Sequence, residues 1–143
     1  MIKNYYYLLV GVLVILSAVT HALNGQLVTL PMLNIDILDI HARTIFFYVW
    51  HIITAENLIF GVAFLLMAFF KDLSKVKFAA WMIGIIMIAR WMVIFGSTLY
   101  KNKTDLLEIL TDSIAITIVV VLIILGIRVK NNGQKNASNR TDL

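Results

Sequence analysis

Side chains able to bind polar ligands or exchange protons are sparse in this 143-residue chain, and three of them lie in one apolar stretch. The segment VWHIITAENLIF, residues 49–60, carries His51, Glu56 and Asn57 among aliphatic and aromatic residues. An imidazole and a carboxylate can take up and release protons, and an amide can hold a polar solute. Ionisable groups inside a hydrophobic helix are costly and commonly mark a binding site or a proton pathway. That is the chemistry this stretch predicts.

Other apolar segments carry groups that could join these three. Helical counting at 1.5 Å per residue places Glu56 and Arg90 at a similar depth, about 15 Å from the outer ends of their helices. Opposite charges at one depth offset each other's cost, so direct or water-bridged contact between them is expected. The predicted polar cavity comprises nine residues: His21, Trp50, His51, Thr54, Glu56, Asn57, Arg90, Trp91 and Asp112.

The polar residues of this stretch avoid one face of the predicted helix. At 100° per residue, a wholly aliphatic arc suits contact with lipid. The opposite arc is small, aromatic or polar and suits contact with protein. The aliphatic arc contains Ile52, Ala55, Ile59, Val62 and Leu66, and the opposite arc contains Trp50, Thr54, Asn57 and Gly61.

Composition indicates an all-α integral membrane protein. The chain is 61% hydrophobic and 14% charged, with a mean hydropathy of +0.91, which is too apolar for a soluble domain of this size. Four runs reach the roughly 20 residues needed to span a bilayer. They predict a four-transmembrane-helix bundle within residues 1–130, with spans at about 5–23, 44–70, 78–100 and 109–127. Residues 131–143 are polar and predict a disordered tail.

Two segments of the N-terminal part of the chain each allow an alternative interpretation. The run at 5–23 follows Lys3 and could be a signal peptide, but its apolar core exceeds the usual length and favours a retained span. Between the first two spans, Leu30, Leu33, Ile37 and Ile40 recur at helical spacing. They predict a short amphipathic helix in the outer interface, and a lid over the outer end of the bundle is the alternative.

The basic residues predict the orientation. Eight lie on the side of the two termini and the 71–77 loop, and three lie on the opposite side, so both termini are expected in the cytoplasm, most naturally at a bacterial inner membrane. The eight are Lys3, Lys71, Lys75, Lys77, Arg128, Lys130, Lys135 and Arg140, and the three are Arg43, Lys101 and Lys103. The net charge of +4 therefore reflects membrane topology, and no nucleic-acid partner is expected.

The sequence leaves several functions open. One is a site that binds or relays a small solute, a proton, or a lipid or quinone head group. Transport by so few helices would need a homo-oligomer or a larger membrane partner. The absence of cysteine excludes thiolate metal sites and covalently attached haem, and no metal site is expected. A b-type haem between His21 and His51 is a weaker expectation because they lie at different depths.

The other reading is a non-catalytic accessory, assembly or immunity-type membrane protein in which the Glu56–Arg90 pair is structural. No motif in the chain carries a reaction, so catalysis is not favoured. In length, number of predicted helices and topology, the chain resembles several families of small bacterial four-helix membrane proteins, including the DoxX-like group.

Overall fold

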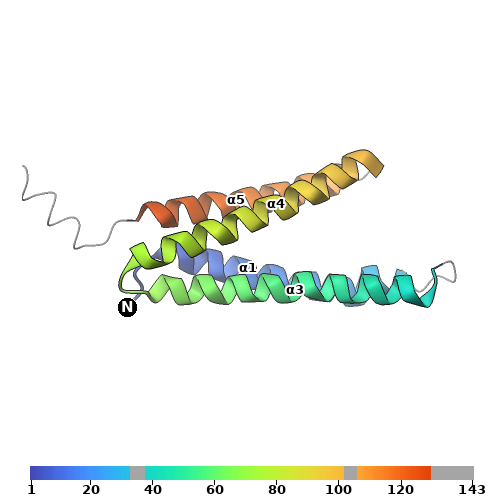
Figure 1. Ribbon diagram of the computed structural model, residues 1–143, viewed down its shortest axis with the longest axis horizontal. Coiled ribbons are helices and arrows are strands. Elements are labelled where there is room, and N and C mark those ends of the chain that lie inside the picture. Colours follow the sequence, from blue (N-terminus) through green and yellow to red (C-terminus); the bar gives the residue numbers. More distant parts are fainter. Residues whose placement is uncertain (33–37, 102–105, 130–143) are drawn as a thin grey trace, which may run out of the picture.

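The computed structural model describes residues 1–32, 38–101 and 106–129, and these are helical almost throughout, with no strand among them (Figure 1). The predicted tail at 131–143 lies outside the described residues. The long elements are α1 (Tyr5–Asn24), α3 (Ile40–Phe69), α4 (Lys77–Lys101) and α5 (Leu106–Arg128). The short elements are a π-helical turn, η1 (Gly25–Thr29), a single turn, α2 (Leu30–Met32), and a 3-10 turn, η2 (Leu73–Val76).

Asn4 ties three chain segments together at one end of the molecule. Its Oδ1 accepts a hydrogen bond from Tyr7 N, 3.2 Å, and so caps α1. Its Nδ2 donates to Gly126 O of α5, 2.8 Å. The adjacent Lys3 N donates to Ala68 O near the end of α3, 2.8 Å. Asn4 is buried, so these bonds lie within the packed end of the molecule.

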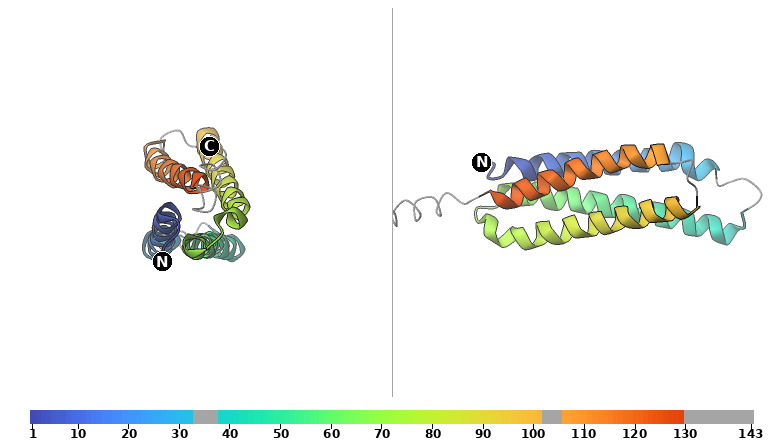
Figure 2. Two further views of the ribbon diagram at one scale, coloured as in Figure 1. Left: turned by 90° about the vertical axis from the view of Figure 1, so that its left-hand side faces the viewer. Right: turned by 90° about the horizontal axis from the view of Figure 1, so that it is seen from above.

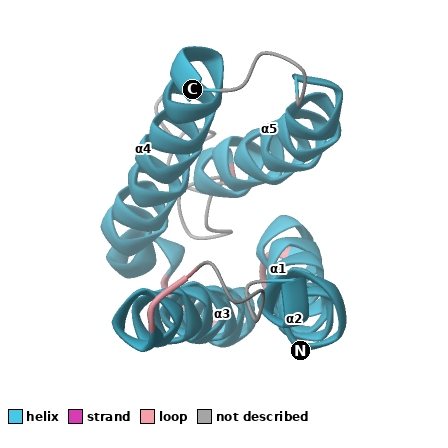
Figure 3. Ribbon diagram, turned by 90° about the vertical axis from the view of Figure 1, so that its right-hand side faces the viewer, coloured by secondary structure: helices cyan, strands magenta, loops and turns pink. Residues whose placement is uncertain are grey.

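The long helices form two pairs, α1 with α3 and α4 with α5, and α1 also packs on α5. Figure 2 shows the four helices end-on, with one pair below the other. The α4/α5 pair tilts away from the α1/α3 pair toward the end opposite the N-terminus (Figures 1 and 3). The apolar core therefore lies mainly where the pairs converge, and it includes Tyr7, Val10, Val14, Phe64, Met67, Ala80, Ile83 and Ile123.

Within the described residues, three stretches of helix are long and apolar enough to cross a membrane: Tyr5–Met32, Ile40–Phe69 and Leu73–Lys101. Their outward faces are rich in exposed apolar side chains, which in water would be unfavourable over so large an area. The predicted aliphatic arc of the second span is exposed along its whole length, and Ile59 on it is 65% exposed. On the opposite arc, Asn57 and Gly61 are buried. The helical class and the rotation of this helix thus agree with the sequence prediction.

At its two described ends, the amphipathic helix expected after the first span is not a separate helix. Gly25–Met32 instead prolong α1 through η1 and α2, and Ile40 begins α3 directly. The Asp39 side chain accepts hydrogen bonds from His41 N and Ala42 N, and this cap starts α3 about four residues before the predicted boundary. Residues 33–37 of the expected helix lie outside the described residues.

Candidate functional site

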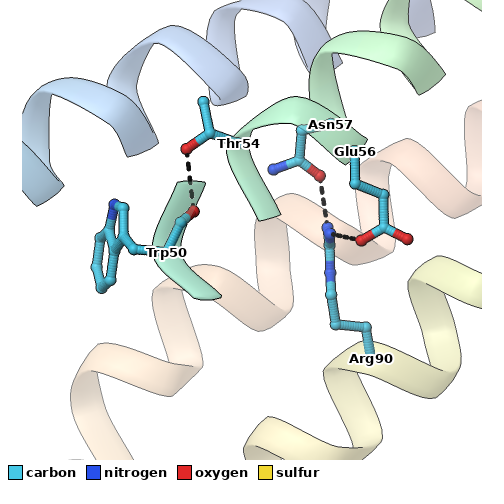
Figure 4. A network of polar contacts seen from close by, with 5 residues as sticks. All are labelled: Trp50, Thr54, Glu56, Asn57 and Arg90. Atoms are coloured by element: carbon cyan, nitrogen blue, oxygen red, sulfur yellow. Dashed lines mark hydrogen bonds and ion pairs between the residues drawn. The ribbon is translucent and has the colours of Figure 1, made fainter. Parts of the chain in front are cut away.

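The guanidinium of Arg90 joins α4 to α3 through two side chains (Figure 4). Arg90 Nη1 lies 3.0 Å from Glu56 Oε2, and Arg90 Nη2 donates to Asn57 Oδ1 at 2.6 Å. The exposed fractions are 22% for the Arg90 side chain and 34% for that of Glu56, while Asn57 is only 6% exposed. The contact between Glu56 and Arg90 is the one that equal depth predicted. The second bond, to Asn57, was not predicted.

The register of this bridge follows from helix geometry. Glu56 lies 13 residues before Phe69, the last residue of α3 (69 − 56), and Arg90 lies 13 residues after Lys77, the first of α4 (90 − 77). The two antiparallel helices are joined by a short turn, so both residues stand about 20 Å from it at 1.5 Å per residue. A long arginine side chain can then cross between helices whose backbones have begun to separate.

A cavity of about 430 Å³ lies between all four long helices. Most of its lining is aliphatic, with residues such as Leu13, Ile53, Met87 and Ile116. The polar lining consists of Ser17, His21, Asn57, Arg90, Trp91 and Asp112. Five of the nine predicted site residues therefore share this cavity. Glu56 stands behind Arg90 and holds it, but is not part of the lining.

Trp91 fixes the level of α5 against α4. Its Nε1 donates to Ser113 Oγ at 2.9 Å, and Ser113 Oγ in turn donates to Ile109 O at 2.6 Å. Asp112, the neighbour of Ser113 in sequence, is therefore held near the level of Arg90 and Trp91. Sequence reasoning missed Ser113, although a hydroxyl beside Asp112 inside an apolar run was an available signal.

His21 is packed against the indole of Trp50. The two rings stack with centroids 4.3 Å apart and an interplanar angle of 3°, and Trp50 Nε1 donates to His21 O at 3.0 Å. A Cβ at Gly25 would lie 2.0 Å from Trp50 Nε1, so only glycine leaves room for the indole. Within the described part of the chain, the buried His21 Nε2 has no hydrogen-bond partner.

The remaining predicted residues lie beside the cavity and not in it. The Gln26 amide donates from Nε2 to His51 Nε2 at 2.9 Å, and Phe47 meets the His51 ring edge-on at 4.5 Å. Thr54 Oγ1 donates to Trp50 O of its own helix, 3.2 Å (Figure 4). His51 and His21 thus have different surroundings, and the expectation of a haem between them remains untested. The described residues contain no group of three or more side chains suited to a metal ion.

Part of the cavity lining is exposed, and the exposed residues come from three helices. They are Ser17 on α1, Ile94 on α4, and Asp112, Ala115 and Ile118 on α5, of which Ile118 is 51% exposed. Between α3 and α4, Arg90 spans the gap. No family model, curated protein or solved structure matches this chain.

Proposed function

We propose that this chain is a multi-pass membrane protein whose cavity binds the head group of an amphipathic molecule of the lipid or quinone class. The proposed topology has four spans and cytoplasmic termini. Support comes from the three long apolar helices and from α5. The 23 residues of α5 are enough to span a bilayer, which takes roughly 20. The proposed role is binding, without a reaction.

The observation that carries the proposal is the mixed chemistry of the cavity wall. Small-molecule sites are concave, have volumes of about 300–1,000 Å³, and combine an apolar lining with a few placed polar groups. The volume of about 430 Å³ and the lining of aliphatic residues around Asn57, Arg90 and Asp112 fit that description. Arg90 is fixed from behind by Glu56, so the polar end of the site is organised before any ligand enters.

The surroundings of the exposed lining favour an amphipathic ligand over a small hydrophilic one. In the proposed membrane orientation, this exposed lining faces the hydrocarbon layer, because the neighbouring surface residues are apolar. Exposed examples are Leu16 and Ile114. A molecule entering sideways from lipid can place its polar end among the polar groups and leave its apolar part along Ile116 and Ile118.

A second function, a non-catalytic accessory or assembly role, is favoured by one specific observation. Both bonds of Arg90 go to side chains of the same molecule, Glu56 and Asn57, as they would if the charge pair served only to hold α3 against α4. In that case the cavity would be a consequence of the helix tilt and would hold no particular ligand.

The two functions are separated by filling the cavity. Ala115→Phe puts an aromatic ring at the exposed part of the cavity lining, and Ile114→Phe is a matched control on the neighbouring exposed face, outside the lining. Each protein is purified in detergent, and the lipids and quinones that co-purify with it are extracted and identified by mass spectrometry. The thermal stability of each protein is then measured with each identified molecule added back. Wild type and Ile114→Phe should retain the ligand and gain about 2.7 kcal/mol at one hundred times its Kd, and Ala115→Phe should do neither.

Equal behaviour of all three proteins would contradict the binding proposal and favour the accessory role. Folding of Ala115→Phe is checked independently by its helical circular dichroism and by its elution as a single species.

A further inference from the structure

Asp112 is a carboxylate on the cavity wall without a counter-ion in the described structure. It belongs to the lining and is exposed. Among the described residues, the one ion pair at this site is that of Arg90 with Glu56, and Asp112 takes part in no hydrogen bond there. A carboxylate on a largely aliphatic cavity wall attracts a cation, and the attraction is strongest where apolar groups exclude water.

Arg90 does not supply that cation. Its Nη1 is committed to Glu56 at 3.0 Å and its Nη2 to Asn57 at 2.6 Å, both on α3, whereas Asp112 is on α5. The positive charge of Arg90 is thus offset by Glu56 directly. Arg90 and Glu56 therefore neutralise each other, and Asp112 is the one charged group at the described cavity wall that has no ion-pair partner.

The surroundings of Asp112 suit a cation with apolar substituents. The bond from Trp91 to Ser113 brings the indole to the level of Asp112, and aromatic rings attract cations as well as packing against apolar groups. His21 also lines this cavity, and its buried Nε2 has no partner in the described part, so it can accept a hydrogen bond from an ammonium group. Aliphatic residues such as Ile116 and Val119 complete the wall.

We propose that the cavity selects a lipophilic cation, an amphipathic molecule whose positively charged head group pairs with Asp112 while its apolar part contacts Trp91 and the aliphatic wall. This inference rests on the proposed binding function and deepens it by naming the charge of the ligand. A neutral quinone or an anionic lipid would leave Asp112 without a counter-ion.

A pair of probes with the same shape and opposite charge tests the assignment. Tetraphenylphosphonium and tetraphenylborate differ in the sign of their charge, and triphenylphosphine oxide is a neutral relative. Their affinities for the full chain in a neutral detergent are measured by calorimetry, with Ala115→Phe as the reference for partition into the micelle. Wild type should bind the phosphonium about tenfold or more tightly than the borate, because the Asp112 carboxylate attracts the cation and repels the anion.

Substitutions then test whether Asp112 causes the preference for the phosphonium. Asp112→Asn should abolish it, whereas Asp72→Asn should keep it, because Asp72 caps the η2 turn at the far end of the molecule. If Asp112→Asn fails to fold, the Glu56→Gln/Arg90→Met double variant serves instead. It removes the other two charges, leaves Asp112 in place, and should retain the preference for the phosphonium.

The outcomes separate this inference from the proposed function. If wild type binds the borate or the neutral oxide as tightly as the phosphonium, the charge assignment is wrong while the binding function stands. A phosphonium preference that persists in Asp112→Asn would also overturn the assignment. If no probe binds wild type more tightly than Ala115→Phe, and no amphiphile co-purifies with wild type, both proposals fail.

Discussion

Arg90 is the residue on which the geometry of the site depends. It connects α4 to α3 where the two helices have begun to diverge, and its partners, Glu56 and Asn57, are successive residues of one helical turn. Loss of one member of a buried ion pair is expensive because the other charge remains desolvated. Here both side chains keep some exposure, 22% and 34%, so water can take over part of the lost interaction.

Single and double substitutions should therefore show strong coupling. Glu56→Gln alone and Arg90→Met alone should each lower the free energy of unfolding by about 1–3 kcal/mol, less than for a fully buried pair. The double variant should recover much of the loss, as measured by thermal unfolding in detergent. Thr54→Val is the control, because Thr54 bonds only to its own helix. Effects that simply add in the double variant would show that the pair contributes no coupling.

The ion pair was predictable from sequence, and its neighbours were not. Equal distance from a short turn fixes the depth of Glu56 and Arg90 whatever their rotamers. The bond of Trp91 to Ser113 depends on how α5 is rotated and shifted against α4, and the stacking of His21 on Trp50 depends on the π turn that follows. No residue pattern in this chain specifies those two geometries, so the sequence predicted which residues are polar but not which of them share the cavity.

At the scale of the helices, α1 and α3 cross closely at two glycines, Gly11 and Gly61. A Cβ at Gly11 would lie 2.9 Å from Gly61 O and 2.7 Å from the Leu65 side chain. A Cβ at Gly61 would lie 3.0 Å from Ile15 N. The backbones meet here because neither residue has a side chain, an arrangement common where helices associate in membranes. This crossing makes α1 and α3 the closely packed pair from which α4 and α5 tilt away.

Replacing glycine by alanine should lower stability at this crossing but not at a helical glycine that has open space around it. Gly11→Ala should lower stability by about 1–3 kcal/mol, because a backbone carbonyl cannot move aside. Gly96→Ala is the matched control in α4, where a Cβ meets nothing within 4 Å. It should be neutral or stabilise by up to about 1 kcal/mol through helix propensity. Thermal unfolding of both variants gives the comparison, and equal effects would show that the α1–α3 crossing tolerates a larger separation.

Across the described molecule, the start of α1, the end of α5 and the α3–α4 turn gather at one pole. The bonds from Lys3 N to Ala68 O and from Asn4 Nδ2 to Gly126 O hold the start of α1 and the ends of α3 and α5 together. Of the described basic residues near the helix ends, most belong to this pole, namely Lys3, Lys71, Lys75, Lys77 and Arg128. The cavity lies toward the other pole, where the helix pairs separate, and there the described helices end in Met32 and Lys101 and begin with Ile40 and Leu106.

The distribution of charge between the poles yields the last prediction, the orientation of the chain in the membrane. The predicted topology assigns eight lysines and arginines to the side of the termini and three to the other, and positive residues are retained on the cytoplasmic side. Reporter fusions after residues 74 and 136 should therefore be active only as cytoplasmic reporters, and fusions after residues 34 and 103 only as external ones. As a control for charge, replacing Lys71, Lys75 and Lys77 by Gln should weaken this bias. A reporter at 136 that maps outside would contradict the placement of α5 as a fourth span, because an odd number of crossings puts the two termini on opposite sides.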